Sequence, residues 1–300
     1  MFDQVIVGIN GQGGGRDALA LAKILLGVGG RLTLVNVYPS EAYVWLGGNP
    51  AYPLFEEEES SKLLERTRQE TGVEADLKQI GDRSVGKGLH ELAEDVGADL
   101  LVVGSSHRGL MGRVTLNHDT RAALNGAPCA VAIAPTGYAG ESRGMREIGV
   151  AYNGSKESEH ALAIARELAA RYGAKLSAFE AVTVPIYAVV HGTTAPDGSP
   201  IEDLVDKARE RIAALAGVEA HAAYGEAEQE LALFSASLDL LVVGSRDYGP
   251  LGRLVHGSTT HRLARSARCP LLALTRAARK TESAAPTADW RTAPRVVGPM

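Results

Sequence analysis

The sequence is poor in cysteine, in aromatic residues and in long apolar segments. Two cysteines among 300 residues exclude a disulfide-rich secreted scaffold, which needs several paired cysteines. The chain has no run of about 18 consecutive apolar residues, so the sequence predicts no transmembrane helix. The first residues, Met1 to Val5, lack the basic segment of a signal peptide. We therefore expect a cytoplasmic protein without a membrane partner.

The charge balance is slightly acidic. There are 36 Asp and Glu residues against 31 Lys and Arg residues, which gives a net charge of −5. This balance supplies no general attraction to nucleic acid, so none is expected as a partner. Only 5% of the residues are aromatic while 45% are hydrophobic, so the core must consist mainly of Val, Leu, Ile and Ala. Glycine, by contrast, is abundant, with 34 residues.

The chain contains one sequence unit twice. The segment 99–105, DLLVVGS, recurs at 239–245, and Cys129 recurs as Cys269, both at an offset of 140 residues. Asn10 recurs as Asn153 at an offset of 143, and Gly81 aligns with Gly225 at 144. The offset thus falls by four residues before the repeated DLLVVGS segment. This fall predicts that the third helix of the second copy is about one turn shorter than that of the first.

Each copy alternates apolar strands with helices. In the first copy we predict strands over 4–9, 31–38, 74–80, 99–103 and 129–134, and helices over 16–28, 54–72, 85–96 and 119–124. This alternation predicts an α/β fold with a parallel sheet covered on both faces. We expect two tandem Rossmann-like domains, each with a five-stranded parallel sheet, over 1–138 and 146–276, followed by a mobile tail over 277–300. Ligands of such folds bind beyond the carboxyl ends of the strands, where the strand order reverses.

A glycine-containing loop follows the fourth strand of each copy. In the second copy it runs from Gly244 to Gly257 and Ser258, and a helix is predicted to begin near Thr259. The unpaired N–H groups of a helix N-terminus suit a phosphate group, and glycines let the backbone approach an anion closely. The Ser258 hydroxyl can cap the helix and also donate to a phosphate oxygen.

This loop, together with the order of strands and helices, resembles the universal stress protein family, here as a tandem member with adenine nucleotide alpha hydrolase-like domains. The nucleotide-binding members carry Gly-x-x-Gly, nine residues, and then Gly-Ser or Gly-Thr. The second copy matches at Gly244, Gly257 and Ser258 but has Asp247 at the second glycine. The first copy keeps Gly104 but departs at His107, Asn117 and His118. The resemblance covers residues 2–135 and 146–275.

The resemblance implies an adenine nucleotide ligand (ATP, ADP or AMP), with or without Mg²⁺, or a related phosphate anion. In the family an Asp after the first strand contacts the adenosine; Asn10 and Asn153 match it, keeping an acceptor oxygen without the charge. Backbone groups after the second strand contact the adenine, near Val37 and Ala181. The candidate nucleotide-binding residues are therefore Asn153, Ala181, Gly244, Arg246, Gly257, Ser258 and Thr259 in the second copy, and Asn10, Val37, Gly104, Arg108, Asn117 and His118 in the first. No catalytic or metal-ligating residue is expected.

Charge differs between the two loops. Asp247 places a carboxylate where the phosphates would lie, and two unit charges about 4 Å apart repel by about 4 kcal/mol at an effective dielectric constant of about 20. Arg246, Arg253 or Mg²⁺ would offset this repulsion. The first copy has cationic candidates instead, His107, Arg108, Arg113 and His118, and Asn117 tolerates a positive φ. However, it has lost two of the three motif glycines and the hydroxyl. Nucleotide binding is therefore expected more strongly in the second copy.

Four other patterns are interpreted as structural. The glycines at 11–15 miss the spacing of a dinucleotide fingerprint, and the segment from Gly81 to Lys87 lacks the Ser or Thr that completes a P-loop, so it is interpreted as the start of the third helix. Glu56–Glu59 are expected in the first turn of a helix, where acids are favourable. Cys129 and Cys269 are expected to be buried apolar residues at the start of the fifth strands, with a redox role or a mutual disulfide as the alternative.

Three functions remain open. The first is a nucleotide-binding stress protein that is not an enzyme, the second an interaction or regulatory module without a ligand, and the third a slow ATPase. The resemblance also implies pairing through the fifth strand. The segments 129–134 and 269–275 would then pair within one chain as an internal pseudo-dimer, and two chains could pair further as a homodimer.

Overall fold

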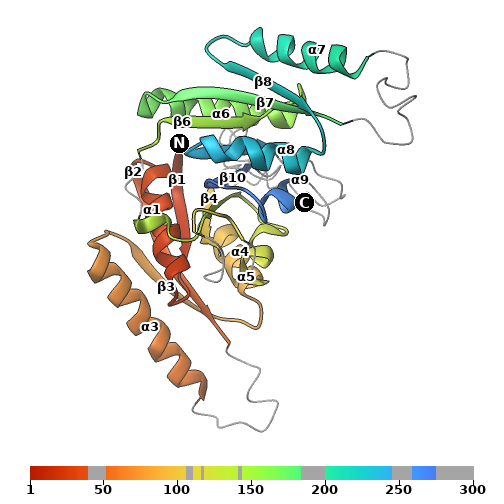
Figure 1. Cartoon of the computed structure of the whole chain (residues 1–300). Coiled ribbons are helices and arrows are strands. Elements are labelled where there is room, and N and C mark those ends of the chain that lie inside the picture. Colours follow the sequence, from red (N-terminus) through yellow and green to blue (C-terminus); the bar gives the residue numbers. More distant parts are fainter. Residues whose placement is uncertain are drawn as a thin grey trace, which may run out of the picture.

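The computed structural model describes residues 1–39, 52–105, 111–115, 118–140, 144–183, 200–244 and 259–274. Within them, ten strands form one continuous sheet with helices on both faces (Figure 1). The first half contains β1 (Phe2–Gly8), α1 (Gly13–Leu25), β2 (Leu26–Tyr38), α3 (Tyr52–Thr71), β3 (Asp76–Gly81), α4 (Val85–Asp95), β4 (Leu100–Gly104), α5 (His118–Leu124) and β5 (Ala130–Ala134).

A short 3-10 helix, η1 (Tyr138–Gly140), leads into the second half. That half contains β6 (Glu147–Ala151), α6 (Lys156–Tyr172), β7 (Lys175–Val182), α7 (Ile201–Ala213), β8 (Glu219–Tyr224), α8 (Ala227–Phe234), the 3-10 helix η3 (Ser235–Ser237), β9 (Leu240–Gly244), α9 (Thr259–Leu263) and β10 (Leu271–Leu274). The element order therefore repeats, as the sequence predicts.

The strand order of the sheet is β3-β2-β1-β4-β5-β10-β9-β6-β7-β8. All neighbouring strands are parallel except β5 and β10, which pair antiparallel, with Leu271 opposite Ile133 and Ala273 opposite Val131. Each half is thus a five-stranded parallel sheet, and the predicted α/β class is confirmed. The strand order reverses between β1 and β4 in the first half and between β6 and β9 in the second.

The two faces of the sheet carry separate apolar clusters because side chains alternate along each strand. Val5 and Val7 belong to the cluster under α1, α3, α6 and α7, whereas Ile6 belongs to the cluster under α4, α5, α8 and α9. Cys129 and Cys269 are buried in the second cluster and are not bonded to each other. The prediction of buried cysteines is confirmed.

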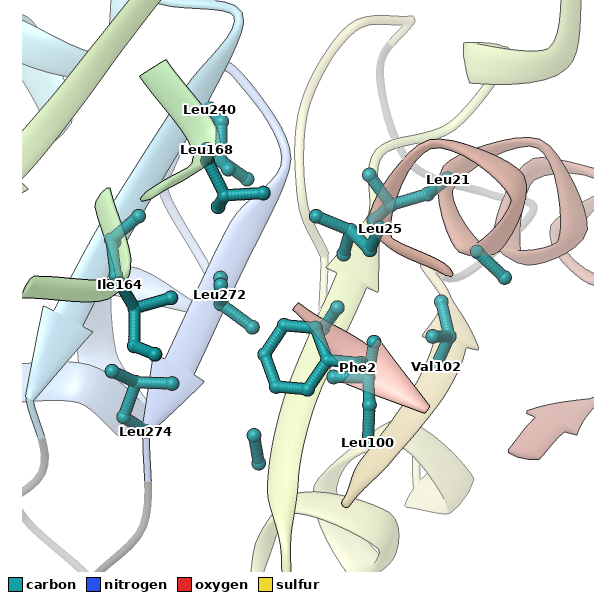
Figure 2. Close-up of a cluster of buried hydrophobic side chains, with 14 of the residues drawn as sticks. Phe2, Leu21, Leu25, Leu100, Val102, Ile164, Leu168, Leu240, Leu272 and Leu274 are labelled. Atoms are coloured by element: carbon teal, nitrogen blue, oxygen red, sulfur yellow. The ribbon is translucent and has the colours of Figure 1, made fainter. Parts of the chain in front are cut away.

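The first cluster runs without a break from one half to the other. Figure 2 shows Phe2, Leu21 and Leu25 of the first half facing side chains of the second half, among them Ile164, Leu168, Leu272 and Leu274. The C-terminal end of α6 adds polar contacts to this boundary: Arg171 Nη1 donates to the Leu26 carbonyl at 2.9 Å, and the Tyr172 hydroxyl donates to the Ile24 carbonyl. The two halves therefore share one core on this face.

Helix α3 begins earlier than the sequence predicts, at Tyr52. Pro53 follows in the first turn, where proline is well tolerated. As a result Glu56–Glu59 lie beyond the first turn, and the explanation of these acids by the helix dipole is wrong. Two of them instead form ion pairs along the helix, since Lys62 Nζ lies 2.8 Å from Glu58 and 3.1 Å from Glu59.

The third helix of the second half is shorter, as predicted. Helix α8 has 8 residues where α4 has 11. The alignment of Gly81 with Gly225 is wrong by one residue, however. In the first half, Tyr38 pairs with Gly81, and its carbonyl accepts a hydrogen bond from the Asp82 N–H. In the second half, Val182 pairs with Tyr224, and its carbonyl accepts a hydrogen bond from the Gly225 N–H. Gly225 therefore corresponds to Asp82, and the shortening is three residues.

The near P-loop segment begins α4, as interpreted. Ser84 caps the helix by accepting a hydrogen bond from the Lys87 N–H at 3.3 Å. The Lys87 ammonium donates to Asp82 at 2.9 Å. Gly86 lies so close to α5 that a Cβ there would be 2.5 Å from the Ala122 carbonyl oxygen. These contacts give the segment a structural role.

Candidate functional site

A cavity of about 810 Å³ lies at the carboxyl ends of the strands in the second half. Its walls come from the end of β6 and the turn after it, from the ends of β7 and β9, from α7, and from the N-terminal parts of α6, α8 and α9. The strand order reverses between β6 and β9, so the cavity occupies the position where open α/β sheets bind ligands. Its volume is in the usual range for small-molecule sites, about 300–1,000 Å³.

Three of the predicted residues of the second half line this cavity: Asn153, Ala181 and Gly244. A fourth, Thr259, is the first residue of α9, and its neighbour Thr260 lines the cavity. The structure therefore brings these predicted positions, which are far apart in the sequence, to one site.

The two asparagines have the same local role in both halves. Asn153 Oδ1 accepts a hydrogen bond from the Ser155 N–H at 3.1 Å, and Asn10 Oδ1 accepts one from the Gln12 N–H at 3.1 Å. Each forms an Asx turn that leads from a strand into a helix. The acceptor oxygen expected to face a ligand is thus used by the turn, and the amide nitrogen is the group that can donate to a ligand.

The first motif glycine is required by packing in both halves. A Cβ on Gly244 would lie 2.3 Å from the carbonyl oxygen of Glu157, and a Cβ on Gly104 would lie 2.0 Å from that of Gly14. Only glycine lets the first turn of α6 or α1 approach the end of the adjacent strand so closely. The glycine cluster at 11–15 shares this contact, since a Cβ on Gly14 would lie 2.9 Å from the Ser105 carbonyl oxygen.

An ion pair that the sequence did not predict stands in the wall of the cavity. Arg211 of α7 donates to both carboxylate oxygens of Glu180 in β7, through Nη2 at 2.6 Å and through Nε at 3.2 Å. The corresponding residue of the first half is Asn36, whose side-chain amide donates to the Ile9 carbonyl at 2.6 Å. The two halves therefore differ in charge one residue before the predicted adenine contacts, Ala181 and Val37.

Tyr152 lies beside this ion pair, at the position of Ile9 in the first half. It is buried, and its hydroxyl donates to Glu159. Burial, followed by the hydrogen bond to Glu159, raises the pKa of Tyr152 to about 12. The tyrosine lines the cavity as an uncharged group, and its hydroxyl stays protonated to a higher pH than that of an exposed tyrosine.

Helix α7 presents two cations to the cavity, Lys207 and Arg211. Arg211 packs near the turn after β6, with its Cδ 3.7 Å from the position of a Cβ on Gly154. The corresponding Gly11 of the first half is approached at 3.5 Å by Leu63 of α3. Since Leu63 takes the place of Arg211, Glu59, one turn earlier, takes the place of Lys207. The charged residues that α7 turns toward the cavity are therefore cations, whereas α3 has a carboxylate and a leucine at the corresponding positions.

The predicted residues of the first half are also near the strand ends. Asn10 follows β1, and Gly104 ends the adjacent β4. Val37 packs toward α4, with its Cγ1 3.1 Å from the position of a Cβ on Gly88. The His118 side chain, at the start of α5, is 93% exposed and lies 3.7 Å from Asp119.

The remaining loop positions lie outside the described residues. The candidate nucleotide-binding residues among them are Arg108, Asn117, Arg246, Gly257 and Ser258, and the charged loop residues are His107, Asp247 and Arg253. The predicted tail over 277–300 also lies outside the described residues. Thr259 is described only as part of the backbone of α9.

Comparison with known proteins agrees with this architecture. The model of the universal stress protein family matches residues 1–135 and 144–275. The chain belongs to this family. A universal stress protein from Mycobacterium tuberculosis is 26% identical over 238 residues, which is 72% of this chain and 77% of the relative.

Two solved universal stress protein structures are similar over 91% of the chain at 17% identity. One, from Archaeoglobus fulgidus, has a TM-score of 0.63 and is covered over 98% of its length; the other, a putative member from Pseudomonas aeruginosa, has a TM-score of 0.60 and is covered over 93%. At this identity the similarity shows the fold of this universal stress protein. None of its described helices is both long and apolar enough to cross a membrane.

Proposed function

We propose that this universal stress protein binds an adenine nucleotide, or a related phosphate anion, in the cavity of its second half, and that it acts in the cytoplasm as a binding protein in the stress response. The observation that carries the proposal is the position of the cavity. It lies at the reversal of strand order, and Asn153, Ala181 and Gly244 line it.

The lining suits both parts of a nucleotide. Phe179, Leu204 and Leu231 give the β7, α7 and α8 side an apolar surface for a base. Hydroxyl groups of Ser155, Ser158 and Thr260 lie on the β6 and β9 side, at the first turns of α6 and α9. Among the charged lining residues that the structure describes, Lys207 and Arg211 outnumber the carboxylate Glu180, which favours an anionic ligand.

The first half is a weaker candidate on the same criteria. Its α3 places Leu63 and Glu59 where α7 places Arg211 and Lys207, and Glu59 is one of a run of four acids. A carboxylate in this position opposes a phosphate ligand by Coulomb repulsion, and the exposed ion pair with Lys62, 3.1 Å away, offsets only part of it. We therefore propose one nucleotide per chain, bound to the second half.

Binding without turnover is favoured by the hydrogen bonding of Glu180, the one carboxylate among the described lining residues. A general base needs an available acceptor close to the reacting group. Both oxygens of Glu180 accept hydrogen bonds from Arg211. This carboxylate is therefore engaged in a structural ion pair and is poorly suited to act as a general base. Release of phosphate from ATP at a rate above a protein-free blank would instead favour the ATPase alternative.

The test combines affinity with location. Isothermal titration of the full chain with ATP, ADP and AMP is expected to show saturable binding to one site. A photoreactive azido analogue of ADP is expected to label peptides from β7 or α7, and excess ADP should suppress the labelling. Absence of binding at millimolar nucleotide, or labelling confined to residues 1–138, would overturn the proposal.

We also propose that the antiparallel contact between β5 and β10 replaces, within one chain, the strand pairing of a dimer. The two strands place Val131 and Ile133 against Ala273 and Leu271 in the centre of the sheet. Because this contact is buried inside the chain, it is not available to a second copy. Light scattering after size-exclusion chromatography is expected to give the mass of one chain, 31.5 kDa, and a dimer mass would point to a second contact elsewhere.

A further inference from the structure

We infer that the cavity of the second half selects adenine nucleotides that carry a second phosphate on the ribose, at the 2′ or 3′ position. This inference rests on the proposed nucleotide site and specifies its ligand. Its basis is the cationic pair that α7 places on the nucleoside side of the cavity, away from the β9 edge.

The two sides of the cavity differ in chemistry. The base needs apolar contact, which Phe179, Leu204 and Leu231 provide around the end of β7. The hydroxyl groups and Gly244 lie on the other side, at β6 and β9. A nucleotide with its base on the apolar side and its 5′-phosphate toward Gly244 would have its ribose near the turn after β6. Arg211 packs against this turn, at Gly154.

Arg211 is held in a defined orientation. Its Nε and Nη2 atoms donate to Glu180, and within the described residues the N–H groups of Nη1 are left for another acceptor. A fixed guanidinium with remaining donors is well suited to a phosphate group. In dinucleotide-binding folds an acidic residue accepts the ribose 2′-hydroxyl, or an arginine nearby accommodates a 2′-phosphate. Here the carboxylate of Glu180 is already paired with Arg211, so Arg211 determines whether a ribose hydroxyl or a ribose phosphate is preferred.

Lys207 strengthens this interpretation. It lies one turn before Arg211 on α7, its side chain is exposed, and it lines the cavity. Within the described part of the chain it pairs with no carboxylate. A second cation four residues from Arg211 lies on the same helix face. Together the two cations provide more positive charge than Glu180, the one carboxylate among the described lining residues, balances. This excess fits an additional phosphate.

The experiment compares three ligands that each carry two phosphates, with AMP as a monophosphate reference. Adenosine 3′,5′-bisphosphate, adenosine 2′,5′-bisphosphate, ADP and AMP are titrated calorimetrically into the full chain. At least one bisphosphate is expected to bind about tenfold tighter than ADP, which carries both phosphates at the 5′ position. ADP binding as tightly as both bisphosphates would overturn the inference and leave the proposed function intact. Failure of all four nucleotides to bind would overturn both.

Two variants assign the preference to the cations. Lys207→Gln and Arg211→Gln are each expected to reduce the bisphosphate preference over ADP at least threefold, with the affinity for AMP changed less than threefold. The matched control is Lys175→Gln, which removes an exposed cation at the opposite end of β7 and should leave the preference unchanged. Thermal melts of each variant confirm folding. An unaltered preference in both folded cavity variants would contradict the inference.

Discussion

The two halves of the molecule share a scaffold but differ in the helix that borders the ligand position. In both, an Asx turn leads from the first strand into a helix whose first turn rests on the glycine that ends the fourth strand. The bordering helix is α3 in the first half, with Glu59 and Leu63, and α7 in the second, with Lys207 and Arg211. The packing constraints have thus been retained in both copies, while the charge beside the site has diverged.

The largest expected effect is a loss of stability at the glycine that ends the fourth strand, a feature that both halves share. Gly104→Ala and Gly244→Ala should each reduce the free energy of unfolding by about 3 kcal/mol, because the new Cβ meets a backbone carbonyl oxygen and the helix must shift. The effect should be similar in the two halves. Gly13→Ala is the matched control, since no atom lies within 4 Å of a Cβ there. Urea denaturation measures all three, and a tolerated Gly244→Ala would show that this glycine is not required by packing.

A second prediction concerns a contact of the first half alone. Asp17 in α1 is buried, and its two carboxylate oxygens accept hydrogen bonds from the N–H groups of Gly137 and Ala139, both at 2.8 Å. The residue at this position in the second half is His160. Asp17→Asn should lower the unfolding free energy by about 2 kcal/mol, because one charged acceptor is replaced by a donor. Asp76→Asn, at an exposed strand position, serves as the control and should be nearly neutral.

A third prediction concerns a variant in which α7 carries the two residues that α3 has at the corresponding positions. The double variant Lys207→Glu, Arg211→Leu should weaken ADP binding about fivefold, which corresponds to about 1 kcal/mol. Glu59→Lys in the first half should change ADP binding less than twofold, because that half is not the proposed site. Calorimetric titration checks both. An equal effect of the two changes would remove the distinction between the halves.

The smallest effect is expected at Tyr152. Tyr152→Phe removes its hydrogen bond to Glu159 and should lower stability by about 1 kcal/mol at pH 7. The folded-state pKa of this tyrosine, about 12, is above the ordinary tyrosine value of 10.0, so its contribution is present below pH 10 and is lost as the pH rises through 12. Urea denaturation from pH 9 to 12 should show a steeper fall for the wild type than for Tyr152→Phe. Parallel curves would contradict this assignment.

Much of the fold could be predicted because repeats and strand patterns are local signals. The apolar segment Leu100–Gly104 and its copy Leu240–Gly244 were identified as buried strands, and their glycines as the ends of those strands. Element ends were less predictable. Strand β2 begins at Leu26, directly after α1, although the glycines at 27, 29 and 30 are atypical of a strand.

The candidate site could be predicted only in part. Asn153, Ala181 and Gly244 were found because they stand at strand ends, where ligands of this fold bind. Glu180 and Arg211 were missed because they are 31 residues apart in the sequence and meet only when α7 packs beside β7. Lys207 was missed for a related reason: its helical position is visible in the sequence, but which face of α7 borders the cavity is determined by the tertiary structure.

The most direct test of the difference between the halves is the number of nucleotides bound per chain. Native mass spectrometry of the full chain, titrated with ADP to saturation, is expected to show a single added nucleotide. Two added nucleotides would mean that the acidic helix of the first half does not prevent binding there, and an absence of any would mean that the cavity of the second half is not a nucleotide site. Either result would contradict the account.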